Sequence, residues 1–135
     1  MFYPCGSGTA DAPITVDAYG EGDMPCIDGA GAEAAVLLRG VDHWHIRNLM
    51  CKNRADERLV RSGIQVIGRP SGITSGIHIE DCEVTDVTGE NRRRMPYYRS
   101  MYWNSGIYVT MPGRSTPEDR LDDIIIEGNY VHDVL

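Results

Sequence analysis

Long apolar runs and helical periodicity are both missing from this chain. No apolar run approaches the roughly 20 residues that a membrane-spanning helix requires, and no long segment places apolar residues at i, i+3, i+4 and i+7. The 15 glycines would interrupt helices further. We therefore expect no membrane partner and an all-β structure.

Positive charge and aromatic side chains are also scarce. Lys and Arg total 13 against 20 Asp and Glu, and a formal charge of -7 argues against nucleic acid as a partner. Aromatic residues make up 7% of the chain, with one Phe, so the core must be built mainly from aliphatic side chains. At 135 residues, we expect residues 1–135 to form a single domain.

Cysteine occurs at four positions whose spacings match neither a zinc motif nor a CxxC redox pair. The simplest expectation is free, buried thiols, because cysteine packs as a small hydrophobic residue. A disulfide between Cys5 and Cys26 is the alternative, and the other two positions are Cys51 and Cys82.

Three blocks of the chain share one apolar pattern without internal gaps: 46–53, 79–86 and 126–133. Each block and the residues before it contain three pairs of apolar or inward positions separated by one residue, as half-buried strands require. The expected strands centre on Val36/Leu38, Trp44/Ile46 and Leu49/Cys51, then Ile64/Val66, Ile77/Ile79 and Cys82/Val84, then Ile107/Val109, Ile124/Ile126 and Asn129/Val131.

Three short strands per repeat, joined by loops of variable length, predict a parallel β-solenoid in which each coil covers the next. The triplet Ser-Gly-Ile occurs three times, with glycine at Gly63, Gly76 and Gly106. Glycine at the entry to a strand permits a corner conformation that a side chain would penalise. We interpret the triplet as a marker of corners and not as an active-site motif.

The segment from Gly6 to Gly22, followed by Met24 to Gly29, resembles a phrase near the start of right-handed parallel β-helix proteins of the pectate-lyase-like group. The resemblance implies a right-handed parallel β-helix, a single-stranded solenoid with three short strands per coil. It also implies a longer helix, so the chain is expected to be an N-terminal fragment whose last coil presents an open end. Relatives include polysaccharide lyases and glycoside hydrolases, so function must be argued from a site.

In a solenoid, equivalent residues of successive repeats lie above one another in a column. One such column is expected to contain Asn53, Asp86 and Asp133. When two carboxylates stack, the pKa of one of them is raised, as general acid catalysis needs, or the pair binds a hard cation such as calcium. His132 could share that site. The alternative is that these side chains satisfy backbone donors at a turn.

Three other positions have mainly structural expectations. Arg47 above Glu80 predicts a surface ion pair that contributes at most about 1 kcal/mol. His45 above His78 predicts exposed polar residues, with a metal or a sugar carboxylate as the functional alternative. Asn129 is expected to point inward, where it needs hydrogen-bond partners, and to begin an asparagine ladder at a corner.

The insertion at 88–105 concentrates basic and aromatic residues in an otherwise acidic chain. Guanidinium groups pair with carboxylates, and aromatic faces stack on sugar rings, so the insertion suits an acidic polysaccharide. The alternative is a loop whose aromatic residues fold onto the helix while its arginines are solvated. The residues concerned are Arg92, Arg93, Arg94, Arg99, Tyr97, Tyr98, Tyr102 and Trp103.

The leading functional hypothesis, implied by the resemblance, is a polysaccharide lyase that cleaves a uronate-containing polymer by β-elimination. The alternatives are a glycoside hydrolase using two aspartates and a non-catalytic carbohydrate-binding or structural module. The family is secreted or periplasmic, although the chain shows no signal peptide. The catalytic candidates are Arg92, Arg93, Asp86, Asp133 and His132, the substrate-binding candidates are Arg94, Tyr97, Tyr98, Tyr102 and Trp103, and the calcium ligands are Asp86 and Asp133.

Overall fold

A computed structural model describes the chain except for residues 58, 91–103 and 114–115. The described residues form three parallel β-sheets and contain no helix, and therefore no helix that could cross a membrane. The strands are β1 (Ile14–Val16), β2 (Cys26–Asp28), β3 (Ala34–Arg39), β4 (Trp44–Arg47), β5 (Met50–Asn53), β6 (Ser62–Ile67), β7 (Ile73–Glu80), β8 (Glu83–Val87), β9 (Ser105–Thr110), β10 (Arg120–Glu127) and β11 (Tyr130–Val131).

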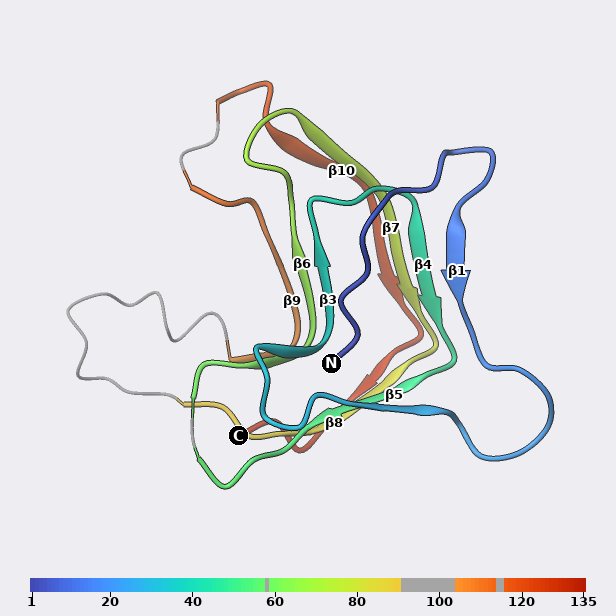
Figure 1. The fold of residues 1–135 in the computed structure, drawn as a ribbon, viewed down its shortest axis with the longest axis vertical. Helices are drawn as coiled ribbons and strands as arrows, with labels where there is room; N and C mark the ends of the chain where they lie inside the picture. The colour runs from blue at the N-terminus through green and yellow to red at the C-terminus, as the bar shows by residue number, and fades with distance from the viewer. Residues whose placement is uncertain (58, 91–103, 114–115) are drawn as a thin grey trace.

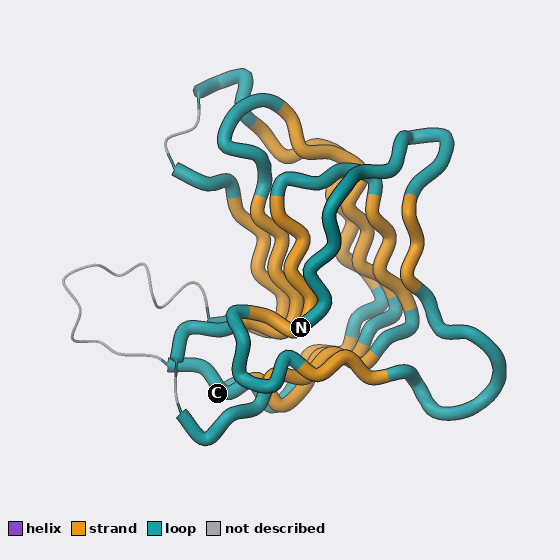
Figure 2. The backbone as a smooth tube through the Cα atoms, in the orientation of Figure 1, coloured by secondary structure: helices purple, strands orange, loops and turns teal. Residues whose placement is uncertain are grey.

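Successive strands go to different sheets, which have the orders β1-β4-β7-β10, β2-β5-β8-β11 and β3-β6-β9. The chain thus passes through the three sheets as three repeats: β3-β4-β5, β6-β7-β8 and β9-β10-β11 (Figures 1 and 2). Each strand pairs in parallel with its counterpart in the next repeat. All nine strands predicted from apolar alternation are present, although β7 and β10 extend to 8 residues.

The N-terminal segment contributes strand structure that the sequence did not predict. Ile14 of β1 pairs with Trp44, and Ile27 of β2 pairs with Cys51. Phe2 forms an isolated bridge with Val36. Residues before the first repeat therefore add to each of the three sheets, and the alternation of Ile14 with Val16 is the signal that could have revealed β1.

The core between the sheets is aliphatic, as predicted. Ile46 and Ile79 are fully buried, and both belong to the main apolar cluster. Their counterpart in the third repeat, Ile126, is 45% exposed. In the register of this sheet Ile46 lies between Val16 and Ile79, and Ile79 lies between Ile46 and Ile126, so the first two repeats are covered on both sides, whereas β10 is the last strand of the described sheet.

Glycine is required in the three Ser-Gly-Ile triplets for two different structural reasons. Gly76 adopts φ +71°, a left-handed conformation that glycine tolerates best, and a Cβ there would also collide with the His43 imidazole. Gly63 and Gly106 have no positive φ; a Cβ would instead run into Val84 and Val131, respectively. The corner explanation therefore holds for Gly76, whereas close packing explains the other two.

All four cysteines are free, so the Cys5 to Cys26 disulfide is not formed. Cys5 and Cys26 are exposed, contrary to the expectation of buried thiols, whereas Cys51 and Cys82 are buried as expected. Burial raises the pKa of the Cys51 thiol to about 12, which keeps it protonated at neutral pH.

Candidate functional site

Several predicted site residues meet on the outer face of the β2-β5-β8-β11 sheet. Glu83 and Thr85 point outward from β8, and Glu83 pairs in register with Tyr130 of β11. His132 and Asp133 follow β11 directly. We call this surface the His132 face and define it by Glu83, Thr85, Asp86, Tyr130, His132 and Asp133.

The His132 ring lies between two carboxylates. Its Nε2 is 3.0 Å from Glu83 Oε1, and its Nδ1 is 2.8 Å from Asp133 Oδ2. Thr85 Oγ1 is also 3.3 Å from Nδ1. A neutral imidazole can donate from one nitrogen only, whereas the imidazolium donates from both, so this arrangement favours the protonated ring.

The hydrogen bond to Asp133, followed by that to Glu83, raises the pKa of His132 above its ordinary value of 6.5. The sign of the linkage follows from this direction. The stabilisation of the folded state by protonated His132 is fully present below pH 6.5, and it is lost as the pH rises through the folded-state pKa of His132. His132 therefore holds a proton more firmly than a free histidine does.

Tyr130 gives the His132 face an aromatic surface. Its ring stacks on the His132 imidazole with centroids 4.3 Å apart and planes 26° apart, and the residue is 64% exposed. An exposed aromatic ring held in place by a neighbour is suited to stack on the apolar face of a sugar.

The predicted column of Asn53, Asp86 and Asp133 is wrong for Asn53. The register shifts between Lys52 and Asn53, so Asn53 pairs with Val87 and not with Asp86. Asn53 is fully buried, and its Nδ2 donates to the carbonyls of Ala32 and Ser62, both at 2.9 Å. These bonds, to the loop before β3 and to the first residue of β6, hold the side chain inside the sheets, where it cannot join an exposed carboxylate column.

Asp86 and Asp133 do occupy equivalent positions, because Val87 and Val134, the residues after them, are bridged. Both adopt left-handed backbone conformations, with φ of 51° and 50°, which aspartate tolerates better than most residues. Asp133 bonds His132, whereas Asp86 Oδ1 lies 3.8 Å from Nη1 of Arg54. The two carboxylates thus face different partners.

The residues that the structure describes include no group of three or more His, Cys, Asp or Glu side chains that could hold a metal ion. Calcium takes 6 to 8 oxygen ligands. Asp86 and Asp133, the predicted calcium ligands, are each engaged with a basic side chain. The described part of the chain does not fit the predicted calcium site.

A pair of histidines lies on the outer face of the β1-β4-β7-β10 sheet. The rings of His45 and His78 stack with centroids 4.2 Å apart and planes 9° apart. Burial, together with His78, lowers the pKa of His45. His78 Nε2 is 3.3 Å from Asp123 Oδ1 but lacks hydrogen-bond geometry. The predicted ion pair of Arg47 and Glu80 is confirmed at 2.7 Å on the same face.

The remaining predicted residues divide into two groups. Asn129 has the hydrogen-bond partners that an inward asparagine needs, but they are backbone groups and not another asparagine: its Nδ2 donates to Ile79 O at 2.8 Å and its Oδ1 accepts from Cys82 N at 2.9 Å. The basic and aromatic residues of the insertion lie outside the described residues: Arg92, Arg93, Arg94, Tyr97, Tyr98, Tyr102 and Trp103.

The sequence alone gave no functional role to Glu83, Thr85 or Tyr130. Their importance follows from their contacts with His132, which lies 49 residues from Glu83 in the sequence. The alignment of the second and third repeats could have identified them, because it places Glu83 beside Tyr130 and Thr85 beside His132.

No protein-family model matches the chain, and no curated protein matches it. Two solved structures of GH136 lacto-N-biosidase from Eubacterium ramulus are similar to it. The selenomethionine derivative aligns with a TM-score of 0.76 and 21% identity over 96% of this chain, and the native protein with 0.63 and 21% over 93%. The chain spans 26% and 27% of those two chains, about a quarter of the enzyme.

These neighbours contradict the resemblance to the pectate-lyase-like group, because they are glycoside hydrolases and no family model supports the resemblance. The physical reason is that alternating aliphatic residues and glycine corners are needed by any chain that stacks short parallel strands. Such patterns therefore indicate how the sheets are built, but they do not identify the family. At 21% identity the similarity itself shows the fold alone.

Proposed function

We propose that this chain is part of a carbohydrate-active protein that hydrolyses glycosidic bonds, and that the His132 face contacts the saccharide. The observation that carries the proposal is the His132 ring held between Glu83 and Asp133 beside the exposed ring of Tyr130. The likeness to a lacto-N-biosidase adds support for hydrolysis over elimination. The lyase hypothesis depended on Arg92 and Arg93, which lie outside the described residues.

We also infer that the three sheets form one solenoid, a parallel β-helix. The support is that every strand of the second repeat pairs in parallel with its counterparts in the first and third repeats. A solenoid presents outward side chains in fixed columns, so a saccharide can lie across several strands at once.

The proposed chemistry uses two carboxylates and one aromatic ring. A sugar ring stacks on Tyr130. Glu83 takes up the Nε2 proton of the His132 imidazolium and passes it to the glycosidic oxygen as the bond from that oxygen to the anomeric carbon breaks, and His132 is reprotonated from solvent. Asp133 accepts a proton from the water that attacks this carbon, so one water is consumed per bond. His132 positions both carboxylates. Asp86 has no part in this assignment because its carboxylate lies toward Arg54.

A non-catalytic carbohydrate-binding module is the second candidate. The side chain of Asp133 is 74% exposed and Tyr130 is 64% exposed. An open surface of this kind suits retention of a long saccharide better than the exclusion of water that many active sites need.

NMR mapping with saccharide fragments tests whether the His132 face contacts carbohydrate. We expect neutral and uronate-containing oligosaccharides to shift the resonances of His132 and Tyr130, while those of His45, on another sheet, stay unchanged. Tyr130→Ala should weaken binding about tenfold, because it removes the stacking surface. Shifts confined to His45 and its neighbours, or equal affinity in the variant, would reject this face as the contact surface.

A further inference from the structure

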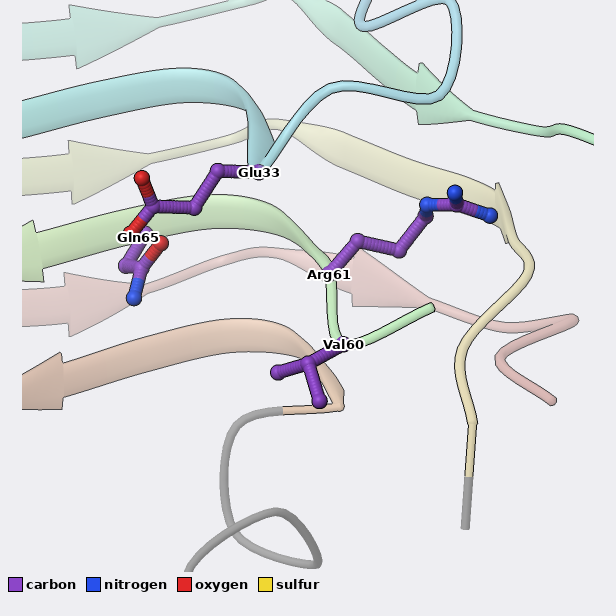
Figure 3. A pocket seen from close by; sticks show the side chains of 4 residues that line it. All are labelled: Glu33, Val60, Arg61 and Gln65. Atoms are coloured by element: carbon purple, nitrogen blue, oxygen red, sulfur yellow. The ribbon is translucent and has the colours of Figure 1, made fainter. Parts of the chain in front are cut away.

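The unpaired polar atoms in the described part of the chain are of two kinds. Five buried side-chain nitrogen or oxygen atoms lack a hydrogen-bond partner there, and four of them belong to β6, β9 and the residues just before these strands. Figure 3 shows the cavity at the start of β6, where the guanidinium of Arg61 points away from Glu33 and Gln65, so the four atoms do not converge on it. The fifth atom is Nε2 of His78, and histidine is the side chain that gains or loses a proton near neutral pH.

His78 lies in a stack of two histidine rings on the outer face of the β1-β4-β7-β10 sheet. His45 of β4 and His78 of β7 pair in register, and their ring centroids are 4.2 Å apart with planes 9° apart. One histidine belongs to the first repeat and the other to the second. The stack therefore joins two repeats through side chains, in addition to the backbone pairing of their strands.

Asp123 of β10 brings the third repeat into contact with this stack. Its Oδ1 lies 3.3 Å from His78 Nε2 without the geometry of a hydrogen bond. The side chain of Asp123 is 55% exposed, so it is free to turn toward Nε2. A protonated imidazole donates from both nitrogens, and a protonated His78 would therefore favour a bond to this carboxylate.

The strands around the stack supply a small set of charges. The charged or titratable side chains near it are His43, Arg47, Glu80, Asp123 and Glu127, with His43 beside Gly76 and Glu127 in register with Glu80. β1 places the uncharged Thr15 beside His45. Arg47 and Glu80 form an ion pair of 2.7 Å, so their charges largely offset one another. Asp123 is therefore the carboxylate available to a protonated ring, because Glu80 is engaged by Arg47.

Acid disfavours the stack, because two positively charged rings at this distance repel each other. Burial, followed by the neighbouring charge of His78, lowers the pKa of His45 below its ordinary value of 6.5. His45 therefore contributes stability that is fully present above pH 6.5 and is lost as the pH falls through its folded-state pKa. The sign is opposite to that of His132, whose proton stabilises the folded state.

We propose that His45, His78 and Asp123 form a pH-sensitive switch on this sheet. At neutral pH the uncharged rings stack and connect the first two repeats on their outer face. When both rings take up a proton they separate, and His78 Nε2 donates to the Asp123 carboxylate. The side-chain contact of His78 thus moves from the first repeat to the third. The switch uses no residue of the His132 face and does not depend on the proposed function.

NMR titration of the histidine rings in the whole chain tests the switch. We would follow contacts between the rings of His45 and His78 from about pH 8 to about pH 4.5, with no saccharide present. We expect these contacts to be lost once both rings are protonated. Asp123→Asn, which keeps the size of the side chain but removes its charge, should lower the pH of this loss by about one unit. Rings that stay in contact when both are protonated, or an unchanged transition in Asp123→Asn, would overturn the proposal.

His45→Phe separates the switch from the other groups that titrate. Phenylalanine keeps a flat ring beside His78 but cannot take up a proton. On acidification, the equilibrium constant for unfolding should rise several-fold more in the unchanged chain than in the variant, as measured by urea unfolding at the two ends of the titration. His132 is present in both proteins, so its opposite effect cancels in the comparison. An equal rise in both proteins would contradict the switch, and if the variant does not fold, the ring contacts of the unchanged chain still decide.

Discussion

Glu83→Gln is expected to lower the rate of saccharide hydrolysis by about 100-fold to 10,000-fold, the contribution typical of a general acid. A carboxamide cannot transfer the proton to the leaving oxygen. The substitution also removes one of the two carboxylates that hold His132, at 3.0 Å from Nε2. Initial rates of reducing-end release measure the first effect. The pKa of His132, followed by NMR, should fall toward its ordinary value, because Glu83 helps to raise it.

The matched control is Glu127→Gln. Glu127 is the last residue of β10, on a different sheet from Glu83, and it is exposed. The same change of chemistry there should leave the rate within about twofold, as surface substitutions away from a site usually have small effects. Equal rates in both variants would remove Glu83 from the proposed mechanism.

Ile79→Ala is expected to lower the free energy of unfolding by about 3 to 4 kcal/mol, in the range for large-to-small substitutions in a core. Ile79 is fully buried and pairs with Ile46 and Ile126 on its two sides. Its truncation leaves a void between neighbouring repeats that neither side can fill without moving a strand.

Ile126→Ala provides the comparison, because this residue occupies the same position one repeat later and is 45% exposed. It should cost only about 1 to 2 kcal/mol, since less apolar surface is removed from burial. Urea unfolding of both variants, with similar m-values, measures the difference. Equal losses would contradict the placement of Ile79 between two covering repeats.

The strand positions could be predicted from the sequence because apolar alternation is a local signal. Ile77 with Ile79 and Ile124 with Ile126 identify their strands without reference to the rest of the chain. The position of Asn53 could not be predicted in this way. Its side chain bonds residues 21 and 9 positions away, and the register shifts by one residue beside it, which the local pattern does not show.

The candidate site was predictable in part for the same reason. His132 and Asp133 are neighbours in sequence, so their association needed no knowledge of the fold. Glu83 meets His132 only because the length of the intervening segment returns the chain to the adjacent strand of one sheet. The family could not be inferred, since the patterns used for it belong to stacked parallel strands in general.

Product analysis of saccharides incubated with the protein tests the central claim most directly. We would follow new reducing ends together with the ultraviolet absorbance of unsaturated sugars, with Glu83→Gln in parallel. The proposed function predicts new reducing ends without that absorbance, and their loss in the variant. Unsaturated products would show elimination in place of hydrolysis, and the absence of any product from saccharides that bind the His132 face would make this chain a binding module.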